Sequence, residues 1–257
     1  MLIPGTSDYA PGDVRVSFLV VTDRGKAVET PTADVWVARS RSDVPFARTV
    51  ARLERIGVPG RTASGATTRI YVAHIRIPRP GTYWLVARPI GDDAHISGIR
   101  DLEVHARSAT PAIGARAVPS RTPTLTTAPV AELTTRVPPD RALLRYSVGG
   151  SLRAHVPFVL VFATPRYCTS RTCGPVVDVV DRVRRTLAGG GIRFIHVEIY
   201  KDNNPAKGEN EWVHQWRLPS EPWIFLVGRD GKIEQRFEGA VSVDELTKAA
   251  RTVFRSS

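Results

Sequence analysis

The chain contains very little cysteine and lysine, and it lacks any long apolar run. Of its 257 residues only two are cysteine, and five lysines accompany 31 arginines. No stretch approaches the roughly 20 consecutive apolar residues of a membrane-spanning helix. Residues 1–5 show neither the basic region nor the long apolar region of a secretory leader. We therefore expect no transmembrane segment, and either a cytoplasmic protein or a sequence that begins after a removed leader.

The charge is strongly basic, with a formal net charge of +11 at pH 7. A basic surface can attract nucleic acid or acidic lipid. The arginines are spread over the whole length, however, and we find no nucleic-acid-binding motif and no basic block with interleaved aromatic residues. With 42% hydrophobic and 24% charged residues, the composition is that of a globular protein. We expect a solvated arginine-rich surface and no nucleic-acid partner, while a position close to a membrane stays open.

Residues 1–107 have the pattern of an antiparallel β-domain. Short alternating or apolar runs occur at residues 14–21, 33–38, 69–77, 82–87 and 98–105. Turn signals separate these runs, and no convincing helix intervenes, which predicts a β-sandwich. The segment 71–86, an alternating strand followed by a Pro-Gly turn and Thr-Tyr-Trp-Leu-Val, resembles the last hairpins of immunoglobulin-like modules. We therefore predict an immunoglobulin-like sandwich for this half of the chain.

Cysteine is absent from this first half, so the predicted sandwich lacks the inter-sheet disulfide of antibody domains. The three histidines His74, His95 and His105 are too scattered along the chain to predict a metal site. Residues 108–140 then change character and are rich in Pro, Thr and Ala without apolar periodicity. They predict a semi-extended linker that wraps over a second domain at residues 141–257.

The two cysteines follow a short apolar run. Residues 157–163 read Pro-Phe-Val-Leu-Val-Phe-Ala, the length of a buried strand, and break at Thr164-Pro165. Cys168 and Cys173 come next, and from Pro175 onward valines recur at helical spacing until Gly189. The cysteines therefore lie at or just before a helix N-terminus, where a thiolate is stabilised.

The spacing of the two cysteines constrains this helix start. Residues five apart in a regular helix rise about 7.5 Å and lie about 140° apart around the axis, whereas a disulfide needs Cα atoms within about 7 Å. Either residues 168–174 form a loop with the helix starting at Pro175, or oxidation unwinds the first turn.

The later elements are typical of a small α/β unit. We expect a strand at 193–200, a short helix at 209–218, a strand at 223–227, a hairpin turn at 229–232, a return strand at 233–238 and a last helix at 242–254. This order, the cysteine-bearing turn, the Glu221-Pro222 step and the Asp-Gly hairpin resemble the thioredoxin-like superfamily over residues 157–254. The resemblance implies a two-domain fold class, an immunoglobulin-like sandwich followed by an α/β thioredoxin-like fold. It also implies that Pro222 is a cis-proline facing the cysteines, and that Tyr167, Glu221 and Pro222 shape a substrate groove.

The cysteine motif departs from thioredoxins, which carry Cys-Gly-Pro-Cys. Counted from the strand, Cys168 holds the place of the attacking cysteine; by identity, Cys173-Gly-Pro looks like the same motif with its second cysteine lost. These two registers assign opposite roles. We expect Cys168 as the nucleophile and Cys173 as the resolving thiol, because strand length constrains position more than a Gly-Pro pair does. The buried Asp of thioredoxins would fall at Phe162, so a proton would need Glu221 or water.

The predicted function is thiol-disulfide exchange with a protein disulfide or dithiol partner, outside the cytoplasm in the cell envelope, without a cofactor or metal. Four alternatives remain. The spacing is similar to one peroxiredoxin type, although Pro165 and Val161 stand where those enzymes have Thr and Pro. Copper delivery would need a histidine near the proline, and His214 is the nearest. The pair can also be a permanent staple or inert thiols, or the protein can be a non-catalytic binding protein.

Overall fold

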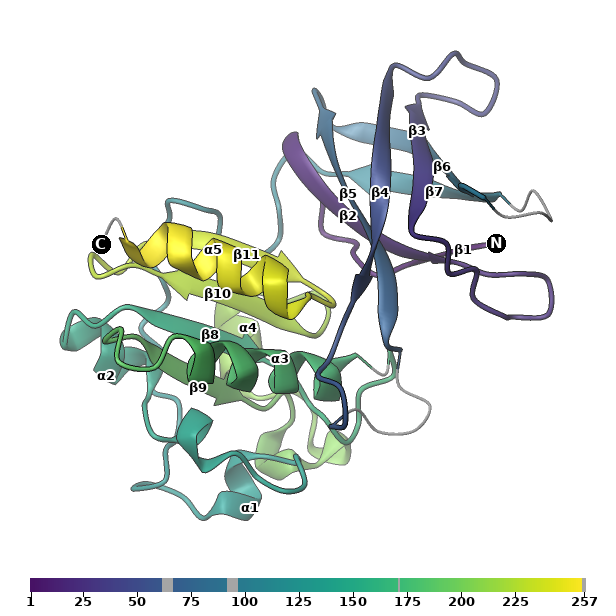
Figure 1. Cartoon of the computed structure of the whole chain (residues 1–257). Coiled ribbons are helices and arrows are strands. Elements are labelled where there is room, and N and C mark those ends of the chain that lie inside the picture. Colours follow the sequence, from purple (N-terminus) through teal and green to yellow (C-terminus); the bar gives the residue numbers. More distant parts are fainter. Residues whose placement is uncertain (62–66, 92–96, 171, 256–257) are drawn as a thin grey trace. The chain divides into compact units, whose positions relative to one another are not determined.

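The computed structural model describes residues 1–61, 67–91, 97–170 and 172–255 (Figure 1). The chain divides into two compact units. The first comprises Met1–Arg55 and Arg69–Ser108, and the second comprises Ile56–Thr68 and Ala109–Ser257. His95 lies outside the described residues. The domain boundaries predicted at residues 107 and 140 stay predictions.

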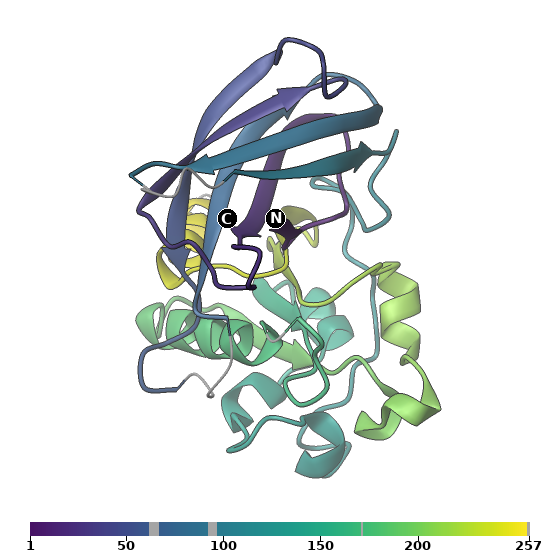
Figure 2. The same cartoon turned by 90° about the vertical axis from the view of Figure 1, so that its right-hand side faces the viewer.

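The described part of the first unit consists of strands. These are β1 (Leu2–Pro4), β2 (Gly12–Val20), β3 (Thr32–Ala38), β4 (Ala47–Arg55), β5 (Arg69–Ile77), β6 (Gly81–Pro89) and β7 (Gly98–Val104). They pair antiparallel in one continuous sheet, in the order β1-β2-β5-β4-β3-β6-β7. The sheet curls so that its two edges approach each other (Figure 2). Gly98 in β7 lies directly against Leu2 in β1. The inner face buries an apolar core in which the rings of Phe18 and Tyr71 stack.

This sheet contradicts the predicted immunoglobulin-like sandwich, which has two separate sheets facing each other. The physical reason is β4, a strand that the sequence analysis does not predict. It pairs with β3 on one side and with β5 on the other, and so joins what would have been two sheets into one. Within the described residues, the first unit is a near-barrel of seven antiparallel strands.

The second unit contains a four-stranded sheet. Its strands are β8 (Phe158–Phe162), β9 (Arg193–Val197), β10 (Trp223–Val227) and β11 (Ile233–Glu238), in the order β11-β10-β8-β9. The pair β8 and β9 is parallel, and the other two pairs are antiparallel. Both central strands, β8 and β10, are buried over their whole length.

Eight helical segments accompany this sheet within the described residues. The α-helices are α1 (Val130–Leu133), α2 (Val148–Arg153), α3 (Cys173–Thr186), α4 (Glu211–Trp216) and α5 (Val243–Arg255), and the 3-10 helices are η1 (Arg141–Leu144), η2 (Lys201–Asn203) and η3 (Pro205–Lys207). Helix α3 forms because its valines recur at helical spacing, and it buries Val176, Val180 and Val183. The rings of Phe162, Trp216 and Phe225 form an aromatic cluster in the core of the sheet.

The predicted thioredoxin-like fold class is also wrong. The order of elements from β8 to α5 matches the predicted order, but order does not by itself determine a fold class. An α/β fold needs layers of helix over its sheet, and only α3 and α5 exceed six residues among the described helices. With a seven-stranded and a four-stranded sheet, the chain is mostly β and has no clear α/β thioredoxin fold.

Backbone hydrogen bonds join the Pro- and Thr-rich segment to the rest of the second unit. The Ala117 N–H donates to the carbonyl of Gly231, and the Gly149 N–H donates to the carbonyl of Ser120. Ser120 also accepts a hydrogen bond from the indole N–H of the buried Trp216. The segment therefore forms part of the second unit's packing.

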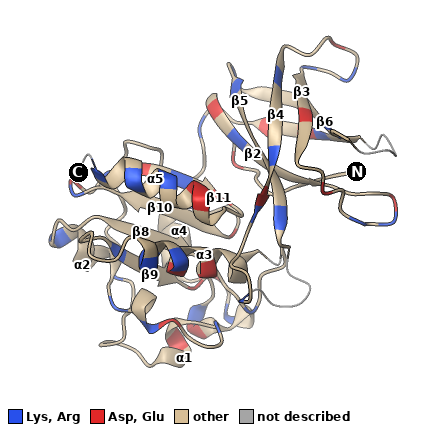
Figure 3. Cartoon of the chain, viewed as in Figure 1, with Lys and Arg blue, Asp and Glu red and all other residues tan. Residues whose placement is uncertain are grey.

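Lysine and arginine occur in both units (Figure 3), consistent with a basic surface distributed along the chain. Among the described residues, no helix has the length and apolar character needed to cross a membrane.

Candidate redox site

The pairing of β10 with β8 brings Glu221 to the start of the cysteine loop. Phe162, the last residue of β8, pairs antiparallel with Trp223, the first residue of β10. Continuing this register by two residues places Thr164 opposite Glu221. Accordingly, the Thr164 N–H donates to Glu221 Oε2 over 2.7 Å. The Glu221–Pro222 peptide bond is cis, as the resemblance implies.

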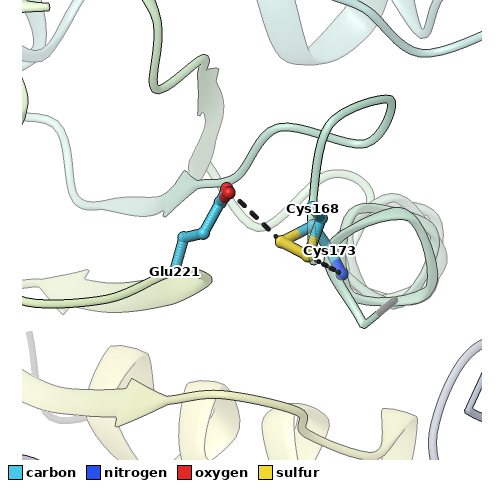
Figure 4. Close-up of side chains that lie close together, drawn as sticks. All are labelled: Cys168, Cys173 and Glu221. Carbon is cyan, nitrogen blue, oxygen red and sulfur yellow. Dashed lines mark hydrogen bonds between the residues drawn. A yellow bond between two sulfur atoms is a disulfide. The ribbon is translucent and has the colours of Figure 1, made fainter. Parts of the chain in front are cut away.

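Cys168 and Cys173 form a disulfide, with their Cα atoms 6.0 Å apart (Figure 4). Helix α3 begins at Cys173, two residues before the start predicted at Pro175. Cys168 therefore lies outside the helix, which resolves the conflict between five-residue spacing and disulfide reach. The Cys173 N–H, one of the first amides of the helix, donates to Cys168 Sγ over 3.3 Å. Such a hydrogen bond at a helix start favours a thiolate on Cys168 after reduction.

The two sulfurs differ in exposure. Cys173 is fully buried, whereas Cys168 is half-buried in the loop before α3. Ser170 Oγ lies 3.2 Å from Cys168 Sγ and 2.8 Å from Thr172 Oγ1. Because of this difference in burial, a large partner can reach Cys168 more easily than Cys173.

Glu221 contacts the buried sulfur. Its Oε2 lies 3.4 Å from Cys173 Sγ (Figure 4). Burial, with a smaller contribution from the negative charges of Glu198 and Glu209, raises the pKa of Glu221 to about 7, although the hydrogen bond from Thr164 lowers it. A carboxyl group with this pKa exchanges its proton near neutral pH, which is the property required of a general acid or base.

Tyr167 and Pro222, the other predicted groove residues, are the chain neighbours of Cys168 and Glu221. The ring of Tyr167 meets the ring of Tyr200 edge-on with centroids 6.3 Å apart, and the Arg166 guanidinium lies over it at 5.5 Å. Pro222 is buried. Their role in binding a substrate stays a prediction.

Possible metal ligands converge at the same place. One ligand atom each from Cys168, Cys173 and Glu221 lie within 4.8 Å of one another. While the sulfurs share a disulfide they offer no thiolate, so an ion could bind only after reduction. His214 is not part of this group; its side chain is exposed and lies 3.8 Å from Glu209.

Sequence reasoning missed the residues that support the cysteine loop. Thr135 Oγ1 accepts a hydrogen bond from the Arg166 N–H and donates one to Glu198 Oε1. Glu198 is only 5% exposed. A signal for it exists, because β8 and β9 are parallel and the carboxyl ends of parallel strands meet at one edge of a sheet. The parallel pairing therefore places a carboxylate that directly follows β9 near the loop that follows β8.

A buried ionic cluster fixes the helix that carries Cys173. Asp181 of α3 is fully buried and accepts hydrogen bonds from Arg61, Arg184 and Arg185 at 2.8, 2.6 and 2.9 Å. Burial opposes the charge of Asp181, but hydrogen bonds from Asp140, Arg61 and Arg184 outweigh it and hold its pKa below the usual range. The cluster therefore anchors α3 from the 56–61 segment of the same unit.

Comparison with known proteins gives no relative for this chain. No protein-family model matches it, no curated protein is significantly similar, and no solved structure matches its fold. Its function must therefore be argued from the chemistry of the site.

Proposed function

We propose that the protein exchanges disulfides with a protein partner through the Cys168 and Cys173 pair. One observation carries this proposal: the two sulfurs are within bonding distance, yet one is accessible at a helix start and the other is buried against a carboxyl group. A two-step exchange requires this asymmetry, because the partner must reach one sulfur first and the second, buried sulfur reacts only after the mixed disulfide has formed.

In the reducing direction, the Cys168 thiolate attacks one sulfur of a partner disulfide. A bond forms between Cys168 Sγ and that sulfur, and the partner's other sulfur leaves as a thiolate. Glu221 then accepts the proton of the Cys173 thiol, and the resulting thiolate attacks Cys168 Sγ. The partner leaves with both sulfurs reduced, two electrons have passed to it, and the protein carries the disulfide. The same steps in reverse oxidise a partner dithiol.

The assignment of Cys168 as the nucleophile is supported by its exposure and by the amide that donates to it. The assignment of Cys173 as the resolving thiol is supported by its burial and its contact with Glu221. This is the chemistry that the resemblance to thioredoxin-like proteins implies at the level of the site. We place the protein outside the cytoplasm, because disulfides persist in oxidising compartments.

The test is covalent trapping. In Cys173→Ser the second step is blocked, so a mixed disulfide on Cys168 should accumulate with a model disulfide protein and be released by reductant. Cys168→Ser is the matched control and should trap far less, since its remaining thiol is buried. Equal trapping by the two variants would overturn the assigned roles.

The same experiment separates the alternatives. Failure of both variants to form any mixed disulfide would contradict exchange and favour a structural staple or a binding protein. Fast oxidation of Cys168 by hydrogen peroxide without reaction with disulfides would favour a peroxidase.

A further inference from the structure

A cavity of about 380 Å³ lies in the second unit at the carboxyl end of β9. Its apolar wall includes Leu133 of α1, and its aromatic wall includes Tyr200 and Trp212. His196 comes from the end of β9, and Glu198 directly follows this strand. The volume falls in the range of cavities that hold small ligands or single side chains of a partner.

Two of the residues that line this cavity each carry a buried polar atom that has no hydrogen-bond partner among the described residues. Glu198 accepts hydrogen bonds from Thr135 on Oε1, but its Oε2 has none. The indole N–H of Trp212 is likewise unpaired. Buried polar groups are nearly always hydrogen-bonded, so each exception requires an explanation. An unpaired acceptor and an unpaired donor on residues that line the same cavity fit a ligand that offers a donor and an acceptor.

The charge of the residues that line the cavity indicates what kind of donor group the ligand carries. Four acidic residues line it, Glu132, Glu198, Asp202 and Glu211, and the one ammonium group in the lining is that of Lys201. This excess of acid stands out in a chain of net charge +11. The ligand should therefore be a cation, and an anion such as phosphate is disfavoured.

The arrangement favours an organic cation over a metal ion. Among the described residues, three metal-ligating side chains converge only at the cysteine pair and not in this cavity. Asp202 is paired with Lys207 at 2.8 Å. Aromatic faces such as those of Tyr200 and Trp212 attract ammonium groups, and their edges accommodate an alkyl stem.

We propose that this cavity binds a primary alkylammonium group, with the ammonium donating to Glu198 Oε2. The alkyl stem packs against Leu133 and the two aromatic rings, and a carbonyl at the other end of the stem accepts the Trp212 N–H. The group comes from a free amine or from a lysine side chain of a polypeptide. Both sources present the same chemistry to the cavity.

The cavity is connected to the cysteine loop. Tyr200 in its wall contacts Tyr167, the neighbour of Cys168. Glu198 is linked through Thr135 to the Arg166 N–H. A polypeptide lysine bound here would bring its chain close to the accessible cysteine, so the cavity is suited to select partners. Binding itself does not depend on exchange, and it can be measured on the oxidised protein.

The test is calorimetric titration of the oxidised full-length protein with Nα-acetyl-lysine amide. Nα-acetyl-norleucine amide, which has the same stem without the ammonium, is the matched ligand control. The lysine amide should bind at millimolar concentration or tighter, and the norleucine amide at least tenfold more weakly, because a charge-assisted hydrogen bond is lost. Butylammonium, which has no carbonyl, distinguishes the sources: affinity below that of the lysine amide supports the Trp212 contact and indicates a polypeptide lysine, whereas equal affinity indicates a free amine and would contradict the Trp212 contact.

Three variants examine the site. Glu198→Gln should weaken binding of the lysine amide about tenfold or more, whereas Glu234→Gln, an exposed glutamate of β11 outside the cavity, should leave it unchanged. Because Glu198 also holds Thr135, Trp212→Phe provides a second variant, which keeps an aromatic ring but removes the indole N–H. It should weaken binding of the lysine amide and spare butylammonium. Absence of lysine amide binding, equal binding of the norleucine amide, or full affinity in both cavity variants would overturn the proposal.

Discussion

Replacing Glu221 with glutamine should stabilise the oxidised protein at alkaline pH and leave its stability almost unchanged at acidic pH. The carboxyl group lies 3.4 Å from Cys173 Sγ and accepts the Thr164 N–H. Burial raises its pKa to about 7 from an ordinary value of 4.5. The neutral glutamine amide keeps an oxygen for Thr164 but carries no charge to bury.

The magnitude follows from the linkage between protonation and folding. In the unfolded chain Glu221 ionises near pH 4.5, and in the folded chain near pH 7. Between these values the folded state binds more protons than the unfolded state, so stability falls as the pH rises. At about 1.36 kcal/mol per pH unit, the wild type loses up to about 3 kcal/mol across this window. The loss is absent below pH 4.5 and complete above pH 7.

Urea unfolding of the oxidised protein at pH 5 and pH 8.5, followed by tryptophan fluorescence, measures the difference. Three of the five tryptophans, at positions 212, 216 and 223, belong to the second unit and report on it. Glu234→Gln, in the same unit but exposed, should shift stability equally at both pH values. The reasoning is refuted if Glu221→Gln is no more stable than wild type at pH 8.5, or if its advantage is the same at pH 5.

Two further predictions concern the same unit. After reduction, iodoacetamide should modify Cys168 at least tenfold faster than Cys173, because Cys168 is accessible at the helix start and Cys173 is buried; peptide mass analysis of a time course measures both rates, and equal rates would contradict the asymmetry. Asp181→Asn should destabilise the unit by about 3 kcal/mol or more, since it leaves the surrounding arginines without their buried counter-charge. Burial opposes the charge of Asp181 but its hydrogen bonds lower its pKa, so the deficit should shrink as the pH falls below the ordinary aspartate value; a deficit that persists unchanged in acid would contradict the ionic explanation.

The sequence was sufficient to predict the local elements around the site. The apolar run of β8 and the valines of α3 have clear periodicity, and the cysteines are the only two in the chain. The position of the helix start at Cys173 could not be predicted, because Pro175 is compatible with several positions in a first helical turn. The contact of Glu221 with Cys173 depends on the register between β8 and β10, which no local pattern specifies.

The fold class of the first unit was predicted wrongly because strand β4 was missed. Its sequence, Ala-Arg-Thr-Val-Ala-Arg-Leu-Glu-Arg, has charged residues where an apolar alternation would be expected, and Ala51 is its only buried residue. The strand exists because both of its neighbours pair with its backbone. Strand propensity reflects such context more than intrinsic preference, so a strand held mainly by pairing leaves little trace in the sequence.

The cavity at the carboxyl end of β9 could not be predicted from sequence patterns either. Glu198 follows β9, Trp212 belongs to α4, and Leu133 belongs to the Pro- and Thr-rich segment that the sequence predicts to be a linker. They meet because this segment folds over the end of β9. A single sequence contains no signal for such a long-range contact between an irregular segment and a strand end.

The reduction potential of the Cys168 and Cys173 pair tests the central claim most directly. The purified protein is equilibrated in graded thiol buffers, and free thiols are counted by mass after alkylation. Disulfide exchange predicts a reversible two-electron transition between about −120 and −270 mV. A pair that remains oxidised well below about −300 mV would be a structural staple, and the proposed exchange would be contradicted.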